Sequence, residues 1–168
     1  MSEEHMEKTR SLLLWSTLVA LVAVALDQLT KIWALGELTE GERIPLLGDF
    51  LGLKLIFNPG AALSLGEGST IIFTIISSVV VIGLPFVLRT TTSRPWALAL
   101  GGVWGGAAGN LIDRLFRAPG VGRGHVVDFI AYSDWFIGNV ADIVLFVSIA
   151  AIAVLSFRNV PRVSPDAR

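Results

Sequence analysis

The chain has 168 residues, of which 53% are hydrophobic and 16% are charged, and its formal net charge is −1. A domain of this length cannot hide so much apolar surface from water, so the composition favours a membrane protein over a soluble globule. The nearly neutral charge gives no basic field for nucleic acid, and a chain with no cysteine and two histidines offers little for disulfide, thiolate or zinc chemistry.

Four apolar stretches are long enough to cross a bilayer, which takes about 20 residues of helix. In chain order they cover about residues 11–35, 69–88, 96–114 and 137–157. The first follows Lys8 and Arg10 and is alternatively a signal peptide, but it is too long, lacks a convincing cleavage site and precedes three further stretches. We therefore predict a mainly α-helical integral membrane protein, with four transmembrane helices in a single domain over residues 1–168.

The segment 36–68, between the first two stretches, is predicted to form a small β-cap. Its residues 50–57 combine alternation with an apolar run, and they lie between Gly48 and the turn signal Asn58-Pro59-Gly60. This pattern is typical of one or two strands, and a segment of about thirty residues is long for a structureless linker. The segment 115–136 is predicted to be a second loop on the same side of the membrane.

The distribution of Lys and Arg between the spans predicts the orientation of the chain. The N-terminal tail, the 89–95 loop and the C-terminal tail together carry seven of these residues, whereas the segments 36–68 and 115–136 carry four. Both termini are therefore expected in the cytoplasm, and the cap is expected outside.

Five glycines in the third stretch predict close helix packing. Gly101, Gly105 and Gly109 are spaced four residues apart, as are Gly102 and Gly106, so each set lies along one face of a helix. A dinucleotide-binding loop is excluded, because no strand precedes these glycines.

Eight polar residues lie in or against the predicted spans, where a charge near the bilayer centre costs about 2.5–3.5 kcal/mol and therefore marks a site. Taken singly, each has a structural alternative: Asp27 and Lys31 form an i,i+4 ion pair, or the N-terminal helix dipole holds Asp142. Together they fall towards the outer ends of three spans or in the segment 115–136: Asp27, Lys31, Asn110, Asp113, Arg114, Asp128, Asn139 and Asp142.

Asp128 and Asp142 come from different segments and are predicted to meet at the outer membrane interface. Two carboxylates close together do not both ionise easily, so they share a proton. One then acts as general base towards water and the other as general acid towards a peptide bond, as in aspartic proteases. Paired acids also cleave glycosides, but this chain hardly has the residues to build a wide polar cleft for a sugar.

Five blocks in this order resemble the lipoprotein signal peptidases (signal peptidase II), which are bacterial membrane aspartyl peptidases. The blocks are Asp27-Gln-Leu-Thr-Lys31, Asn58-Pro-Gly-Ala-Ala-Leu-Ser64, Gly105-Gly-Ala-Ala-Gly-Asn-Leu-Ile-Asp-Arg114, Val126-Val-Asp-Phe-Ile130 and Asn139-Val-Ala-Asp142. The chain departs from the family pattern at Leu63 and Gly138, where the family often has phenylalanine.

The resemblance implies four transmembrane helices with a small extracytoplasmic β-cradle. It also implies that the enzyme removes the signal peptide of a prolipoprotein just before a diacylglyceryl-modified cysteine. By position, Asp128 and Asp142 are the catalytic pair. The resemblance assigns supporting or substrate-binding roles to Asp27, Lys31, Asn58, Gly60, Ala62, Asn110, Asp113, Arg114, Asn139 and Ala141.

The sequence also gives expectations about cellular location, binding partners and an alternative function. The resemblance implies a multi-pass protein of the bacterial cytoplasmic membrane, with its active site near the outer face. We expect a monomer that contacts prolipoprotein and membrane lipid, with no nucleic acid, no metal and no other cofactor. The alternative function is a small proton- or cation-coupled transporter or channel subunit, whose intramembrane acids bind ions. The acids cluster at one end and no internal repeat is evident, which favours the peptidase.

Overall fold

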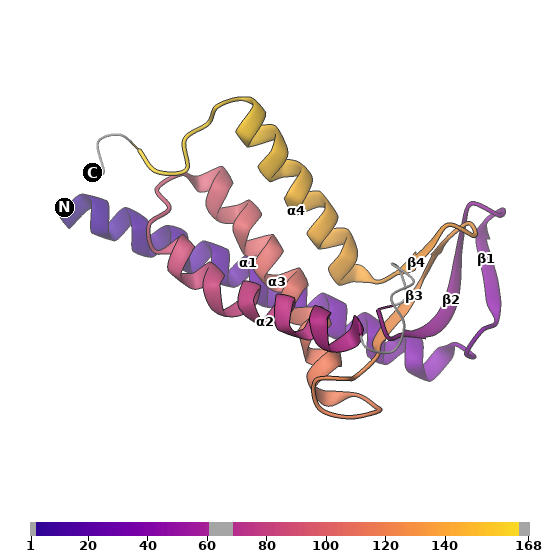
Figure 1. Ribbon diagram of the computed structural model, residues 1–168. Coiled ribbons are helices and arrows are strands. Elements are labelled where there is room, and N and C mark those ends of the chain that lie inside the picture. Colours follow the sequence, from indigo (N-terminus) through magenta and orange to yellow (C-terminus); the bar gives the residue numbers. More distant parts are fainter. Residues whose placement is uncertain (1–2, 61–68, 165–168) are drawn as a thin grey trace.

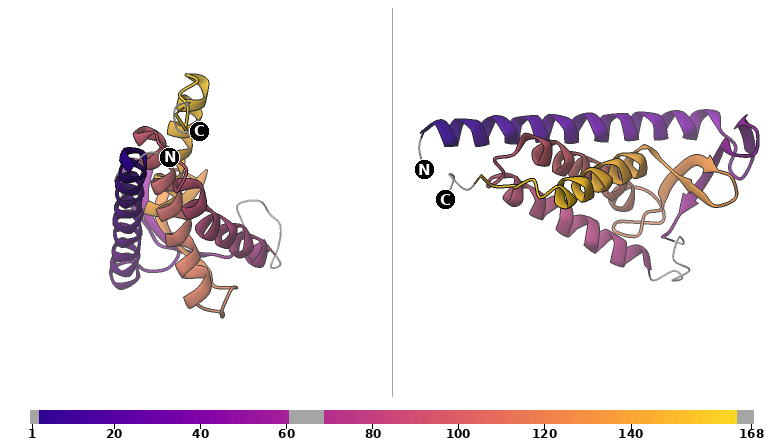
Figure 2. Two further views of the ribbon diagram at one scale, coloured as in Figure 1. Left: turned by 90° about the vertical axis from the view of Figure 1, so that its left-hand side faces the viewer. Right: turned by 90° about the horizontal axis from the view of Figure 1, so that it is seen from above.

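The computed structural model describes residues 3–60 and 69–164, which form four helices and one four-stranded sheet. The helices are α1 (Glu3–Glu37), α2 (Ser69–Leu88), α3 (Arg94–Phe116) and α4 (Val140–Phe157). The strands are β1 (Arg43–Leu47), β2 (Leu51–Asn58), β3 (Val126–Tyr132) and β4 (Phe136–Gly138). Both termini lie at one end of the helices and the sheet lies at the other end (Figures 1 and 2). The prediction of a mainly helical protein with a small β-structure is confirmed.

Three of the described helical segments are long and apolar enough to cross a membrane: Thr9–Glu37, Thr70–Leu88 and Val140–Phe157. Their outer faces carry exposed apolar side chains such as Leu14, Ile82 and Phe146, which suits contact with lipid. The predicted span over residues 96–114 falls in α3, which has 23 residues but is not among the three. α3 is rich in glycine and alanine and packs against α1, α2 and α4. A helix in that central position contacts other helices more than lipid, so it needs small residues more than large apolar ones.

The two sets of glycines on α3 face two different helices, as the spacing predicts. A Cβ atom placed on Gly101 or Gly105 would lie 2.7 Å from a backbone oxygen of α1, that of Ser16 or Ala20 respectively. A Cβ atom on Gly106 would lie 2.8 Å from the backbone oxygen of Ala141, on α4. The glycines therefore let α1 and α4 approach the backbone of α3 from two sides.

We expect Gly105→Ala to lower the free energy of unfolding by about 1–3 kcal/mol, because the new methyl group overlaps the backbone of α1. The matched control is Gly83→Ala on α2, where a Cβ atom meets nothing within 4 Å and alanine favours the helix. Thermal unfolding of both purified variants in detergent measures the effect. Equal melting temperatures for the two variants would contradict close packing at Gly105.

The sheet combines two segments that are far apart in the sequence. It is antiparallel with the strand order β1-β2-β3-β4. The strand predicted over residues 50–57 is β2. The segment 115–136, predicted as a loop, also supplies β3, which lies between β2 and β4. Its sequence does not reveal a strand by alternation, because four consecutive residues from Val126 are buried.

Candidate active site

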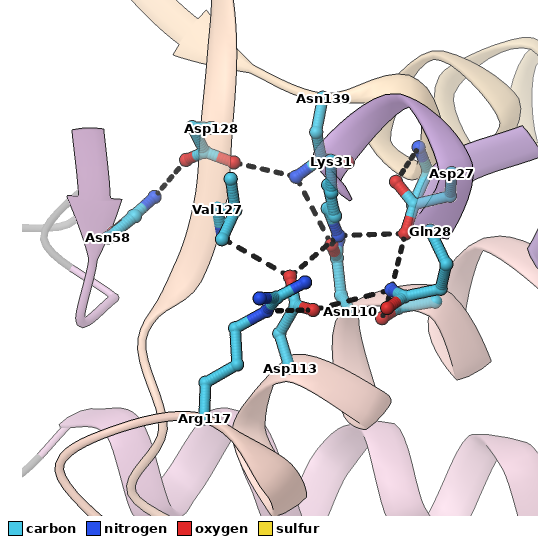
Figure 3. Close-up of polar contacts among 12 residues, drawn as sticks. Asp27, Gln28, Lys31, Asn58, Asn110, Asp113, Arg117, Val127, Asp128 and Asn139 are labelled. Atoms are coloured by element: carbon cyan, nitrogen blue, oxygen red, sulfur yellow. Dashed lines mark hydrogen bonds and ion pairs between the residues drawn. The ribbon is translucent and has the colours of Figure 1, made fainter. Parts of the chain in front are cut away.

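Lys31 is fully buried and joins α1 to α3 (Figure 3). Its Nζ lies 2.8 Å from Oδ2 of Asp27 and 2.8 Å from Oδ2 of Asp113, and it donates to Oδ1 of Asn110 at 3.0 Å. The predicted i,i+4 pair of Asp27 and Lys31 is therefore present, and it is part of a larger cluster. A buried ammonium group needs such partners, because an unpaired charge inside a protein is costly.

The two carboxylates around Lys31 hold the backbone next to the two predicted catalytic residues. Oδ1 of Asp27 accepts a hydrogen bond from the backbone N–H of Ala141 at 2.9 Å, one residue before Asp142. Oδ2 of Asp113 accepts one from the backbone N–H of Val127 at 3.1 Å, one residue before Asp128. The ion cluster thus fixes the start of α4 and the start of β3 relative to each other.

Asp142 lies in the first turn of α4 and forms a capping box with Asn139. Oδ1 of Asn139 accepts from the backbone N–H of Asp142 at 3.0 Å, and Oδ2 of Asp142 accepts from the backbone N–H of Asn139 at 3.1 Å. This cap explains why α4 begins at Val140 rather than at residue 137. Oδ1 of Asp142 also accepts from Nδ2 of Asn110 at 2.8 Å.

Asp128 lies on β3 and is only 1% exposed. Its Oδ1 accepts from Nδ2 of Asn139 at 2.6 Å, and its Oδ2 accepts from Nδ2 of Asn58 at 2.8 Å (Figure 3). Burial raises the pKa of Asp128 to about 7, and the charge of Asp142 adds to the rise, while the bonds from Asn58 and Asn139 oppose it. Asp128 therefore retains a proton near neutral pH more readily than an ordinary aspartate.

Asn139 brings the two predicted acids together. Its side chain donates to Asp128 and its backbone donates to Asp142, and the same side chain contacts Oδ1 of Asn110 at 3.1 Å. Two carboxylates from different elements thus meet around one asparagine. One of them is deeply buried and the other lies at the end of a helix.

Three predicted site residues remain to be placed: Gly60, Ala62 and Arg114. Gly60, with a φ of +111°, donates its backbone N–H to Oδ1 of Asn58 at 2.8 Å and so orients that amide. Ala62 lies outside the residues that the structure describes. Arg114 is buried with its guanidinium 5.4 Å from the ring centre of Phe73, and its Nε and Nη1 have no hydrogen-bond partner in the described part of the chain.

Two further residues complete the ion cluster and are absent from the predicted site. Nε2 of Gln28 donates to Oδ2 of Asp27 and to the carbonyl of Gly109, both at 3.1 Å. Nε of Arg117 lies 2.7 Å from Oδ1 of Asp113. Arg117 was detectable from the sequence, because it follows Asp113 at i,i+4 spacing, whereas the contacts of Gln28 depend on how α1 meets α3.

Asp142 lines one pocket, and Asn58, which binds Asp128, lines another. Trp135 and Phe136 line both pockets. The apolar pocket has a volume of about 780 Å³ and is lined by Tyr132, Trp135, Phe136, Asn139, Asp142, Ile143, Leu145 and Phe146. The cationic cleft has a volume of about 270 Å³ and is lined by Arg43, Lys54, Ile56, Asn58, Ser133, Asp134, Trp135, Phe136 and Ile137. Within residues 3–60 and 69–164, no group of three or more acidic, histidine or cysteine side chains is placed to hold a metal.

Comparisons with known proteins agree on one family. A family model described as signal peptidase (SPase) II matches residues 19–158. The chain is 50% identical over 133 residues to a lipoprotein signal peptidase of Rhodococcus jostii. The matched region covers 79% of this chain and 66% of that relative. It is 45% identical over 141 residues to a lipoprotein signal peptidase of Streptomyces griseus, covering 84% of this chain and 72% of the relative.

Two solved structures described as a bacterial membrane enzyme are similar to this one. The first has a TM-score of 0.73 and 28% identity, and the match covers 84% of this chain and 91% of that chain. The second has a TM-score of 0.75 and 27% identity, with coverages of 89% and 92%. The arrangement of helices and sheet therefore recurs in an experimentally determined membrane enzyme.

Proposed function

Since the chain belongs to the signal peptidase II family, we propose that it removes the signal peptide from diacylglyceryl-modified prolipoproteins and cleaves just before the lipidated cysteine. Family membership makes the chain a hydrolase of the lipoprotein signal peptidase type. The observation that carries the proposed mechanism is the position of Asn139, which binds Asp128 through its side chain and Asp142 through its backbone.

In the proposed reaction, Asp128 and Asp142 share one proton and act on one water molecule. The ionised carboxylate takes a proton from the water, whose oxygen attacks the carbonyl carbon of the scissile peptide bond. The protonated carboxyl gives its proton to the carbonyl oxygen, which forms a tetrahedral intermediate. A proton then passes to the nitrogen of the lipidated cysteine, the C–N bond breaks, and the signal peptide leaves with a new carboxyl group.

The apolar pocket suits the lipid part of this substrate. Its lining combines Asp142 with aromatic and aliphatic side chains such as Tyr132, Ile143 and Phe146, of which Phe146 is 76% exposed. Each buried CH₂ group of an acyl chain contributes about 0.8 kcal/mol. Acyl chains in this pocket would hold the cysteine beside Asp142 without leaving an apolar environment.

We expect the purified chain, reconstituted in lipid, to cleave a prolipoprotein that carries a diacylglyceryl-cysteine and to leave the same precursor with an unmodified cysteine intact. Mass spectrometry of the products identifies the new N-terminus at the lipidated cysteine. Cleavage of neither precursor, together with proton or cation flux into vesicles that contain the protein, would instead favour the transporter alternative.

In the proposed topology all four helices span the membrane, including α3, and both termini lie in the cytoplasm of a bacterial cell. Two observations support it: the termini lie at the end opposite the sheet (Figure 2), and seven Lys and Arg residues flank that end against four at the other. The active site would then lie near the outer face of the cytoplasmic membrane, in a monomer. Tags at both termini should be digested by protease only after the cells are permeabilised.

The pKa of Asp128 predicts how activity depends on pH. The shared proton is present below about pH 7 and is lost as the pH rises through the pKa of Asp128. We therefore expect kcat/KM to fall by about tenfold per unit as the pH rises well above 7. Initial rates with a diacylated peptide, measured from about pH 6 to about pH 9, test this. A constant rate across that range would contradict a role for protonated Asp128.

A further inference from the structure

The cationic cleft lies along the same face of the sheet as Asp128. Lys54, Ile56 and Asn58 of β2 all line the cleft, although an irregularity in the pairing between Leu53 and Ile56 interrupts the two-residue alternation of the strand. Ile56 is the direct partner of Asp128 in the pairing of β2 with β3, which places the Asp128 side chain on that face too. A continuous track therefore leads from Lys54 past Ile56 to Asn58 and Asp128.

The outer part of this track carries an excess of positive charge. Arg43 and Lys54 are direct partners in the pairing of β1 with β2, and like charges in that position destabilise a sheet. The guanidinium of Arg43 already has partners within the protein. It donates to the backbone carbonyls of Ser133 at 2.9 Å and Asp49 at 2.8 Å, and it lies 3.5 Å from the carboxylate of Asp134. No acidic side chain lies within ion-pair distance of Lys54 among residues 3–60 and 69–164.

The geometry points to a peptide rather than an acyl chain in this cleft. Its polar lining consists of two cations, the amide of Asn58, Ser133 and the carboxylate of Asp134, which suit a polar ligand. Trp135 and Phe136 lie between this cleft and the apolar pocket at Asp142, because they line both. β2 leads from Asn58 away from the helices, towards the hairpin turn between β1 and β2 (Figure 1). A substrate anchored by its lipid at Asp142 would therefore extend its water-soluble part along this track.

We propose that the cationic cleft binds the mature part of the prolipoprotein, downstream of the scissile bond, and that Lys54 selects acidic side chains there. This inference rests on the function proposed above. At about 3.3 Å per residue, Lys54 lies about 13 Å along β2 from Asn58. An extended substrate covers that distance with about four residues. The selected acid is therefore expected at about the third or fourth residue after the cleaved bond.

Diacylated precursor peptides that differ only at these two positions, with aspartate, asparagine or lysine, test the proposal. For the wild-type chain we expect kcat/KM to be about threefold to tenfold higher with aspartate than with lysine, mainly through KM. Added salt should reduce the difference, because the pair is partly solvent-exposed. Lys54→Gln should abolish the preference and Lys54→Glu should reverse it.

The matched control is Arg123→Glu, which makes the same charge change at an exposed residue between α3 and β3, outside the cleft. That variant should keep the wild-type order of substrates. Equal rates with all three peptides in the wild-type chain would overturn the cleft assignment and leave the proposed function standing. The same conclusion follows if Lys54→Glu slows all three peptides by one factor. Failure to cleave any diacylated peptide would instead remove the proposed function, and the cleft assignment with it.

Discussion

Asp142→Asn and Asp128→Asn are each expected to lower kcat by at least about a thousandfold while the protein remains folded. Asparagine preserves the size of each side chain but can neither take a proton from water nor share one with the remaining acid. At Asp142, the amide oxygen can still accept from the backbone of Asn139 or from Asn110, so the cap of α4 is largely retained. Rates with a diacylated precursor measure the loss.

The control for these two variants is Asp49→Asn, because Asp49 is exposed in the turn between β1 and β2. It should keep near wild-type activity. Melting temperatures of the Asp128 and Asp142 variants must stay close to that of the wild type for the loss to be chemical. A folded Asp142→Asn variant that cleaves at near wild-type rate would show that the pair has been misassigned.

Lys31→Met is expected to lower the free energy of unfolding by about 3–5 kcal/mol, which is the largest stability effect that we predict for a single substitution. The variant leaves the carboxylates of Asp27 and Asp113 buried without their shared cation. Activity should fall as well, because those carboxylates hold the backbone at Ala141 and Val127. Thermal unfolding in detergent measures the first effect.

A matched substitution distinguishes the stability effect of disrupting the ion cluster from the effect of removing a lysine elsewhere in the chain. Lys54→Met removes a partly exposed lysine that forms no ion pair with the described residues, and the stability should change by no more than about 0.5 kcal/mol. Adding Asp27→Asn to Lys31→Met should recover part of the stability, because Asp113 still pairs with Arg117 and the uncompensated carboxylate of Asp27 is removed. Equal melting temperatures for Lys31→Met and Lys54→Met would contradict the role given to the cluster.

The parts of the site that the sequence predicts are those governed by local spacing. Asp27 and Lys31 pair at i,i+4, Asn139 and Asp142 share the first turn of α4, and the glycines of α3 mark its two packed faces. Each follows from the 3.6-residue period of one helix, with no knowledge of neighbouring elements. The limits of α2 follow from apolar length, since it occupies the predicted residues 69–88. α1 begins before its predicted first residue 11, at Glu3, and α4 begins after its predicted first residue 137, at Val140.

The parts that escape prediction depend on pairing between distant segments. Asp128 lies on a strand because β3 pairs with β2, about seventy residues earlier, and a local apolar run does not encode that pairing. The bonds from Asp113 to Val127 and from Asn58 to Asp128 have the same origin. α3 is a further case, because its composition reflects contact with three other helices rather than with lipid.

The bonds from the ion cluster to the backbone also mean that the site is complete only when residues far apart in the sequence are all present. Asp27 and Lys31 form an ion pair within the first helix. Asn110 and Asp113 follow with the third helix, and Asp142 emerges from the ribosome after all of them. Because the proposed pair needs Asp142 and the N–H of Ala141 in place, a chain translated only as far as α3 lacks part of the proposed site.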